Sequence, residues 1–337
     1  MKELEHYEDL EIKFAEWNEL DPTGMVACSS GTAALHLALE AMQLPLGSRV
    51  IVPDLTMVAC PRAVMLAGLV PKFVDCDDRL LMKTFPLRDK ENLGRMTRTV
   101  MPVHVYGRRC DMDYVSRTAK TLEWVVVEDL AEAHGIRPHE QTDAACWSFY
   151  KNKIIAGEEG GAVYFRDPEH AKLARQLRSL GFTDDHDFTH VPRGHNYRMS
   201  NCHAELVLKS LAEADENIKK RWQVEHWYAT KIPREWQMPA RDAVWVYDLR
   251  IPGMTSEQQD RLVRGLNAKG VAARHCFKPM TMMEEWRGQQ PVSPNALRLS
   301  REVIYIPISP QTTEIEVATT VDKLLTTVSS VSSGLGH

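Results

Sequence analysis

The chain has 337 residues, of which 44% are hydrophobic and 26% are charged, and its formal net charge is -5. This balance is typical of a folded globular protein, and a chain of this length is expected to form a larger and a smaller domain. No run of Lys or Arg indicates a nucleic-acid surface, and no stretch of about 18 apolar residues indicates a membrane span.

The seven cysteines are scattered singly, without a CxxC pair or another spacing typical of metal sites. We interpret them as small buried side chains in a reducing compartment, and we expect no metal. The first 20 residues are amphipathic and acidic, whereas a signal peptide needs a basic start and an apolar run. A cytoplasmic location is the expectation that follows.

Short apolar runs alternate with helix-forming stretches over the first half of the chain. A helix is predicted over residues 5–20, and turn residues at 21–24 end it. Strands are predicted over the apolar runs at residues 25–29, 49–53, 71–74, 99–105, 124–128, 145–149 and 161–165. Helices are predicted at residues 33–43 and 59–67. This alternation predicts an α/β fold, with a three-layer, mainly parallel sheet, helices on both faces, and ligands at the carboxyl ends of the strands.

The pattern changes near residue 200. Residues 201–227 predict one long amphipathic helix that leads to a second, small α+β domain. In that domain, strands are predicted at residues 245–251 and 303–307 and helices at residues 256–269 and 313–326. The predicted organisation is an N-terminal helix at residues 1–20, a large domain at 21–200, a linking helix at 201–228, a small C-terminal domain at 229–328 and a disordered Ser- and Gly-rich tail at 329–337.

The residues Ser30, Gly31, Thr32 and Ala33 stand between a predicted strand and a predicted helix. A helix N-terminus presents unpaired N–H groups and a positive dipole end, so this position could hold an anion. Taken alone, such a motif is more often a helix cap with a glycine turn. It lacks the GxGxxG and GxxxxGK[ST] patterns, which disfavours the nucleotide-binding folds that use them.

Two acidic residues, Glu128 and Asp129, follow the apolar residues 125–127. A carboxylate at the carboxyl edge of the sheet would lie where ligands bind, and a buried carboxylate needs a positive partner. A protonated pyridine nitrogen would be such a partner, and its charge makes the ring an electron sink. Equally, the acidic residues could cap the helix expected near Leu130.

Two lysines, Lys151 and Lys153, lie between the predicted strand at residues 145–149 and the glycine-rich segment at 157–161. A lysine that is desolvated at a sheet edge can lose its proton near neutral pH and form an imine with an aldehyde. Most lysines are solvated surface residues, and local chemistry does not choose between these two.

The order of the motifs is more specific than any one of them. In chain order they are SSGTAALHLAL, PVHVYG, EDLAEAHG, SFYKNK with the adjoining GEEGG, and GHNYRMS. Together they resemble the DegT/DnrJ/EryC1/StrS family of sugar aminotransferases, from about residue 25 to about residue 325. The resemblance implies the fold type I architecture of the aspartate aminotransferases and pyridoxal 5'-phosphate as the cofactor.

The resemblance assigns parts of the cofactor to particular residues. The backbone N–H groups of Gly31, Thr32 and Ala33 would surround the phosphate. Asp129 would pair with the pyridine nitrogen, and Glu132 would approach the ring hydroxyl. Many members have Gln or His at the latter position, and Glu is found in members similar to perosamine synthases.

Further assignments concern the lysine and the neighbouring subunit. In the family's SFxxxK stretch the lysine forms the Schiff base, which selects Lys153, and Ser148 contacts the phosphate. Met57 stands where an aromatic residue usually covers the cofactor ring, and a thioether can still cover a π face. The family's GxNYRM asparagine, here Asn196, reaches the phosphate of the neighbouring subunit, which implies a homodimer with shared active sites.

The activity that the resemblance implies is a two-stage amino transfer. An amino donor, expected to be L-glutamate, would convert the cofactor to pyridoxamine 5'-phosphate, and a keto group of a nucleotide-linked sugar would then accept the amine. Lys153 would move the proton, and Asp129 would keep the ring nitrogen protonated. Other family members aminate cyclitols and other ketones, so the acceptor depends on loops. The stretch before residue 29 and the one at 136–145 are shorter than usual, and residues 274–280 stand where relatives have substrate-facing side chains.

Three competing interpretations are weaker. Sugar dehydratases of the same family commonly carry His at the lysine position, so Lys153 argues against them. A regulatory protein that has lost turnover would not need Asp129, Ser148, Lys153 and Asn196 intact. An α/β protein without a cofactor would require all the ordered motifs to be accidental.

Overall fold

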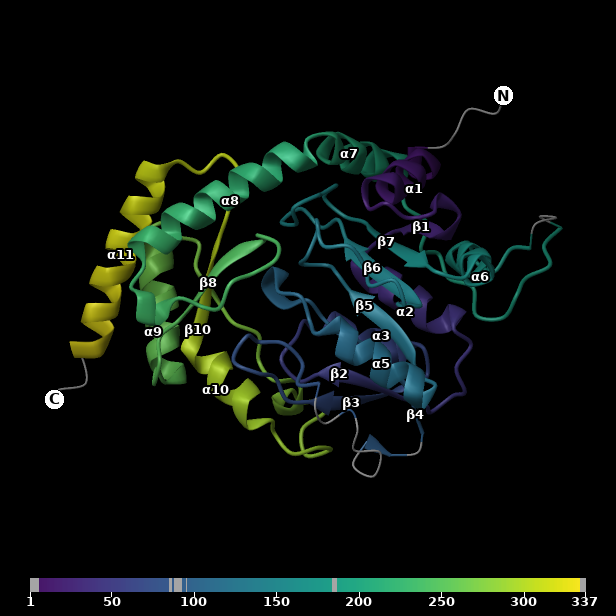
Figure 1. The fold of residues 1–337 in the computed structure, drawn as a ribbon, viewed down its shortest axis with the longest axis horizontal. Coiled ribbons are helices and arrows are strands. Elements are labelled where there is room, and N and C mark those ends of the chain that lie inside the picture. Colours follow the sequence, from purple (N-terminus) through teal and green to yellow (C-terminus); the bar gives the residue numbers. More distant parts are fainter. Residues whose placement is uncertain (1–5, 85–86, 88–92, 95, 184–186, 334–337) are drawn as a thin grey trace.

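Seven strands form a large sheet in the order β1-β7-β6-β5-β4-β2-β3 (Figure 1). The computed structural model describes residues 6–84, 87, 93–94, 96–183 and 187–333. The strands of this sheet are β1 (Met25–Cys28), β2 (Arg49–Pro53), β3 (Val70–Val74), β4 (Thr97–Val100), β5 (Val125–Asp129), β6 (Ala144–Ser148) and β7 (Gly161–Phe165). Neighbouring strands are parallel, except that β7 is antiparallel to β1 and β6. The predicted mainly parallel α/β sheet is therefore confirmed.

Helices cover both faces of the large sheet, as predicted. The helices of this part of the chain are α1 (His6–Trp17), α2 (Gly31–Ala41), α3 (Ala59–Leu66), α5 (Met112–Leu122), α6 (Pro168–Arg178) and α7 (Asn201–Ala212). Because strand side chains alternate between faces, Val26 and Cys28 pack in one hydrophobic cluster with α2, whereas Met25 and Ala27 pack in another with α1 and α7. The sheet is thus the middle of three layers.

A small antiparallel sheet with the order β8-β10-β9 follows in the sequence (Figure 1). Its strands are β8 (Val246–Arg250), β9 (Arg274–His275) and β10 (Val303–Pro307). The helices here are α8 (Ala214–Lys231), α9 (Ser256–Ala268), α10 (Pro294–Glu302) and α11 (Glu314–Ser333). None of the helices in the described part of the chain has the length and apolarity that a membrane span requires.

A buried ion cluster joins the two sheets. Arg108, which follows β4 and the 3-10 turn Val105–Gly107, donates from Nη1 and Nη2 to the two carboxylate oxygens of Asp248 in β8, at 2.7 and 2.9 Å. Arg241 Nη2 donates to the same carboxylate at 2.7 Å. The Arg108 and Asp248 side chains are fully buried, so this contact fixes β8 against the large sheet.

The long helix predicted over residues 201–227 is wrong in one respect, because two helices occupy this stretch. Glu213 separates α7 from α8 with φ -103° and ψ 2°, which is outside helical geometry. α8 then begins with Asp215 and Glu216 in its first turn, where negative side chains stabilise a helix N-terminus. Asp215 also accepts a hydrogen bond from Trp17 Nε1 at 3.0 Å, which holds this junction against α1.

The strand predicted over residues 99–105 is shorter than expected, since β4 ends at Val100. Pro102 has no N–H to donate to a sheet ladder. Its carbonyl still accepts from Asp129 N at 2.9 Å, so the chain remains beside β5. The left-handed conformations of Tyr106 (φ 52°) and Gly107 (φ 78°) then turn it away from the sheet.

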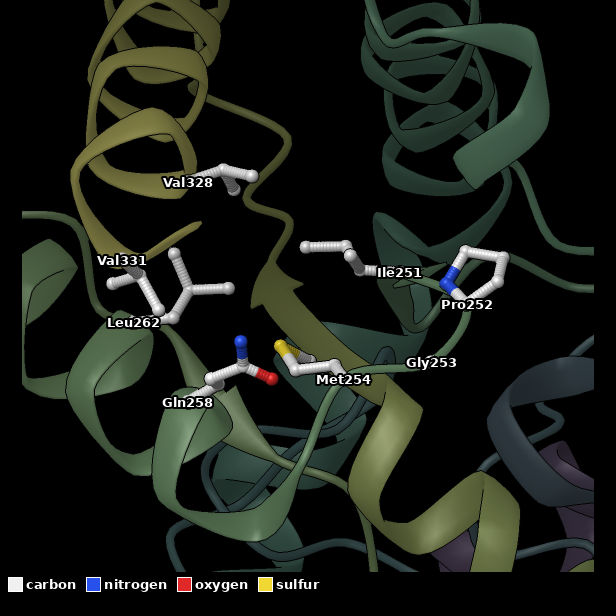
Figure 2. Close-up of a pocket in the computed structure, with 8 residues that line it drawn as sticks. All are labelled: Ile251, Pro252, Gly253, Met254, Gln258, Leu262, Val328 and Val331. Atoms are coloured by element: carbon white, nitrogen blue, oxygen red, sulfur yellow. The ribbon is translucent and has the colours of Figure 1, made fainter. Parts of the chain in front are cut away.

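The tail predicted to be disordered over residues 329–337 is helical as far as Ser333, and residues 334–337 lie outside the described residues. Val328 and Val331 continue the helical spacing of α11 and face the core of the small sheet. Figure 2 shows both valines beside a cavity of about 110 Å³, together with Leu262 of α9. Val331 is buried and Val328 is partly buried, so packing against the small sheet favours a helix that continues past the serines.

Candidate active site

A cavity of about 410 Å³ lies where the carboxyl ends of β5 and β6 meet the N-terminus of α2. Most of the site residues predicted from the sequence line it. They are Gly31, Thr32, Met57, Asp129, Glu132, Ser148 and Lys153. Ala33 and Asn196 do not belong to its lining. The cavity therefore joins residues from three of the ordered motifs, together with Met57, at the edge of the sheet where ligands bind in α/β folds.

The N-terminus of α2 forms one end of the cavity. Ser30 caps the helix, because its Oγ accepts a hydrogen bond from Ala33 N at 3.1 Å. The N–H groups of Gly31 and Thr32 belong to the first turn, where the helix itself offers no acceptor. A Cβ on Gly31 would lie 2.7 Å from Ser148 Cβ, so only glycine lets the two segments meet. The arrangement suits an anion near Gly31, Thr32 and Ser148.

Asp129 is the last residue of β5, and its side chain is buried on the face of the sheet that α2 covers. Its Oδ1 accepts from Ala131 N at 2.9 Å, and its Oδ2 accepts from Cys60 Sγ at 3.0 Å. Burial and the Asp129 carboxylate raise the pKa of Cys60 well above its ordinary value, so this donor is a neutral thiol. Within the described residues, no Lys or Arg nitrogen lies within ion-pair distance of Asp129.

Strand alternation sends Glu128 to the opposite face of the sheet. There it accepts from His139 N at 2.8 Å, and its other oxygen lies 2.9 Å from His104 Nε2. His104 Nδ1 accepts from Cys110 N at 3.1 Å, which leaves Nε2 as the N–H that donates to Glu128. Local chemistry left open whether these acidic residues bind a ligand or cap a helix, whereas the resemblance selected Asp129, and the structure brings only Asp129 to the cavity.

The structure also distinguishes the two lysines. Lys151 is exposed, whereas the Lys153 side chain is 11% exposed and lies in the cavity. Lys153 Nζ is 3.8 Å from Glu132 Oε1 and 4.0 Å from the centroid of the Trp245 ring. Burial lowers the pKa of Lys153 from its ordinary value, while the Glu132 and Asp129 carboxylates oppose this change. A buried amine of this kind is suited to nucleophilic and proton-transfer chemistry.

Glu132 is the second carboxylate of the cavity, and it is 6% exposed. Its Oε2 accepts from Tyr106 N at 3.0 Å, which fixes the side chain beside Lys153. Burial raises the pKa of Glu132 from 4.5 to about 7, although Lys153 and the Tyr106 N–H act in the opposite direction. The ionisation of each group therefore depends on that of the other.

Aromatic side chains form a wall of the cavity that the sequence did not predict in full. Trp245, Phe277 and Tyr305 line it from the region of the small sheet. Trp245 Nε1 donates to the carbonyl of Asn152 at 2.7 Å. Phe277 falls in the segment expected to face the substrate, but nothing in the local pattern singled out Trp245 or Tyr305. Met57, which is 49% exposed, lies at the open rim of the cavity.

A chain of polar contacts joins α2 to the segment that carries Asn196. Glu40 Oε2 lies 2.6 Å from His195 Nε2, and the Tyr197 hydroxyl lies 3.1 Å from His36 Nδ1. His36, Glu40 and His195 are also the one group of potential metal ligands in the described chain, with their atoms within 4.8 Å of one another. Asn196 itself is exposed, away from the cavity of its own chain.

Comparisons with known proteins agree with this architecture. A model described as the DegT/DnrJ/EryC1/StrS aminotransferase family matches residues 2–325. The chain is 36% identical to a GDP-perosamine synthase of Caulobacter vibrioides, over 77% of this chain and 73% of that protein. It is 31% identical to a GDP-perosamine synthase of Escherichia coli O157:H7, over 93% and 87% of the two chains.

The fold agrees equally well with solved structures. The crystal structure of S. venezuelae DesV in complex with a ketimine intermediate gives a TM-score of 0.86 at 28% identity, covering 97% of this chain and 89% of that one. The family that the ordered motifs resembled is thus confirmed over the whole length of the match. The chain belongs to the DegT/DnrJ/EryC1/StrS aminotransferase family, whose members are enzymes that use pyridoxal phosphate.

Proposed function

We propose that this enzyme transfers the amino group of an amino acid, L-glutamate, to a keto group of a nucleotide-linked sugar. The transfer would have two half-reactions, and Lys153 would be the residue that holds pyridoxal phosphate. The observation that carries the proposal is the meeting, in one cavity, of the α2 N-terminus, the buried Asp129 carboxylate and the buried Lys153 amine. These are an anion site, a partner for a cationic ring and a nucleophile.

The residues of the cavity fit pyridoxal phosphate in three respects. Gly31 and Ser148 are in such close contact that a Cβ on Gly31 would clash, and the N–H groups beside them suit a phosphate. Asp129 is buried with hydrogen-bond donors but without a cation in ion-pair distance among the described residues, which suits a protonated pyridine. Lys153 has an amine of lowered pKa, which suits an aldehyde.

When bound, pyridoxal phosphate supplies the electron sink that stabilises negative charge at the substrate carbon. The protein supplies the proton transfers. Lys153, once its amine is free, would take a proton from the substrate carbon onto its Nζ and later give a proton back from the same atom. Glu132, 3.8 Å from Nζ, can hold the proton that Lys153 releases, because its pKa is raised to about 7. Asp129 keeps the ring nitrogen in its protonated form.

The relatives support a sugar nucleotide as the acceptor. Two of them are named GDP-perosamine synthases, and another, at 30% identity, is named a dTDP-3-amino-3,4,6-trideoxy-alpha-D-glucose transaminase. A relative at 31% identity is named 3-amino-5-hydroxybenzoate synthase, which keeps a non-sugar ketone as the second candidate. Lys153 argues against the dehydratases of the family, which commonly carry His at this position.

We further propose that the enzyme is a homodimer with shared active sites and works in the cytoplasm. The exposed Asn196, held by the contacts between α2 and residues 195–197, is available to a second copy rather than to its own cavity. The seven cysteines are all free, and all but Cys202 are buried, which suits a reducing compartment.

The cofactor form decides the proposal. Purified protein incubated with pyridoxal phosphate is expected to develop the visible band of a lysine imine, and L-glutamate is expected to bleach it. Lys153→Ala should abolish the band, while Lys151→Ala, a lysine two positions away and exposed, should retain it. A wild-type protein that stays colourless would overturn the proposal. A band that glutamate leaves unchanged would refute amino transfer from this donor.

The acceptor requires a second experiment. The aminated cofactor form is mixed with keto sugar nucleotides and, in parallel, with cyclic ketones that carry no nucleotide. Return of the visible band with a sugar nucleotide supports the proposed acceptor class. Return with the cyclic ketones alone would replace it with the second candidate.

A further inference from the structure

Trp245 contacts the side-chain amine of Lys153 and the backbone carbonyl of the preceding residue, Asn152. Its ring centroid lies 4.0 Å from Lys153 Nζ, the distance at which an ammonium group is attracted to the ring face. Its Nε1 donates to the carbonyl of Asn152 at 2.7 Å, in the peptide that leads into Lys153. One side chain therefore fixes the backbone and the amine of the same lysine.

Trp245 is itself held firmly. It is 5% exposed and stands immediately before β8. Arg221 Nη1 donates to the Trp245 carbonyl at 3.1 Å and to the Ile308 carbonyl at 2.9 Å. The indole also packs on the rings of Tyr106 and Tyr305, at centroid distances of 5.9 and 6.0 Å. The ring cannot follow Lys153 if the lysine moves, so it defines a fixed place for the amine.

The amine in this place lies near two groups that favour its charge. One is the π face of Trp245, at 4.0 Å from the ring centroid, and the other is Glu132 Oε1 at 3.8 Å. Burial acts against the charge and lowers the pKa of Lys153. A cation–π contact is strongest when water is excluded. The indole therefore restores part of the stability that burial takes from the protonated form of Lys153.

We propose that Trp245 is a positioning residue that holds the free amine of Lys153 against its indole face and favours the protonated form. The significance of this contact rests on the proposed function, in which Lys153 must be released, accept a proton and give it up again. The ring determines where the released amine rests, and how readily it loses its proton to Glu132.

The test measures the pKa of Lys153 in the full-length, cofactor-free chain, by the pH titration of its NMR signal after isotopic labelling of lysines. Lys153→Arg identifies the signal. Fluorinated tryptophan replaces tryptophan throughout, because fluorine weakens the charge distribution of the ring but preserves its shape. Within the described residues, Trp245 is the tryptophan with a lysine amine over its ring. The expected result is a fall in the pKa of Lys153 by a few tenths to about one unit.

Two substitutions separate the contributions of the ring and the N–H group. Trp245→Phe keeps a ring face but loses the donor to Asn152. Most of the contribution of the ring to the pKa of Lys153 is therefore expected to remain. Trp245→Leu loses both, so a fall of about one unit is expected. Phe277→Leu is the matched control, since Phe277 lines the same cavity but packs on Tyr106 rather than on Lys153. It should leave the pKa of Lys153 unchanged.

A merely structural role for Trp245 would lower thermal stability in the substituted proteins without moving the pKa in the fluorinated one. An unchanged or higher pKa in the fluorinated protein would therefore overturn the proposal, even if Trp245→Leu fails to fold. Failure of the proposed function gives a different result. The wild-type chain would then stay colourless with pyridoxal phosphate, while the titration of the cofactor-free chain would still decide the role of Trp245.

Discussion

The thiol of Cys60 in α3 lies 3.0 Å from Oδ2 of Asp129 in β5, and both side chains are buried. The thiol donates, because its pKa is raised by burial and by the carboxylate itself. Thr56 Oγ1 lies 3.4 Å from the same sulfur and continues the network toward the cavity rim. The residue proposed to face the cofactor ring is thus oriented by a neutral donor from a neighbouring helix.

Removal of this donor should destabilise the protein. Cys60→Ala leaves one oxygen of the buried Asp129 without its hydrogen bond, and we expect a loss of about 1–3 kcal/mol in the free energy of unfolding. Cys60→Ser keeps an O–H donor in nearly the same place, so its loss should be clearly smaller. Urea denaturation of the cofactor-free proteins measures both. Equal losses in the two variants would mean that packing, and not the hydrogen bond to Asp129, is what Cys60 contributes.

The contact between Gly31 and Ser148 should control phosphate affinity. In Gly31→Ala the new Cβ would lie 2.7 Å from Ser148 Cβ, so α2 must shift away from β6. Overpacking of this kind costs about 1–3 kcal/mol, which corresponds to roughly a 5- to 150-fold rise in the dissociation constant for pyridoxal phosphate. Absorbance titration with the cofactor measures it.

A double-mutant cycle provides the control for Gly31. Ser148→Gly removes the side chain that the new Cβ would meet, so Gly31→Ala should cost less affinity in that background than in the wild type. If Gly31 mattered only for backbone freedom, its contact with Ser148 would be irrelevant. The affinity losses caused by Gly31→Ala and Ser148→Gly would then simply add.

Glu132 should make stability depend on pH. Its pKa is raised from 4.5 to about 7 by burial, so the folded chain binds more protons than the unfolded chain between these values. Stability contributed by the protonated form is therefore present below about pH 4.5 and is lost as the pH rises to about 7, by up to about 3 kcal/mol. Glu132→Gln removes this titration, while its amide oxygen can still accept the Tyr106 N–H.

The measurement is the difference in unfolding free energy between the wild type and Glu132→Gln across this range. The wild type should lose stability relative to the variant as the pH rises from 4.5 to 7. A constant difference would contradict the raised pKa and show that Glu132 ionises as an ordinary carboxyl group.

Hybrid dimers can test the proposed role of Asn196. Lys153→Ala and Asn196→Ala are each expected to lose most activity as homodimers. When the two are mixed and allowed to exchange subunits, a shared site would place both defects in one cavity and leave the other cavity intact. Activity should then return to about a quarter of that of the wild type, by the statistics of random pairing into C2 dimers. If activity does not recover although subunits exchange, Asn196 does not contribute to the active site of the neighbouring subunit.

Much of the fold could be predicted from the sequence, because the strands are short apolar runs between glycine and proline turns. β2, β7 and β10 have the predicted limits. The errors arose where tertiary contacts override local pattern. Nothing in the helical periodicity of residues 201–227 reveals the break at Glu213, and the Ser-rich end of α11 is helical because Val331 is buried against the small sheet.

The candidate site was predictable to the extent that it is built from contiguous motifs. Strand alternation could have separated Asp129 from Glu128, since adjacent residues face opposite sides of a sheet. The choice of Lys153 over Lys151 needed either the family motif or the structure. Trp245 approaches Lys153 from a distant part of the chain, 93 positions beyond Asn152, so no local spacing could indicate that contact. The aromatic wall of the cavity depends on long-range packing, whereas the other predicted site residues belong to local sequence motifs.

The ion cluster of Arg108, Asp248 and Arg241 has a consequence for how ligands reach the cavity. To swing β8 away from the large sheet would break the buried bidentate contact between Asp248 and Arg108. We therefore expect no hinge between the two sheets during turnover. Ligand exchange would instead use the rim beside Met57 and Tyr150, which are 49% and 38% exposed, so discrimination among acceptors would rest with rim loops and not with domain closure.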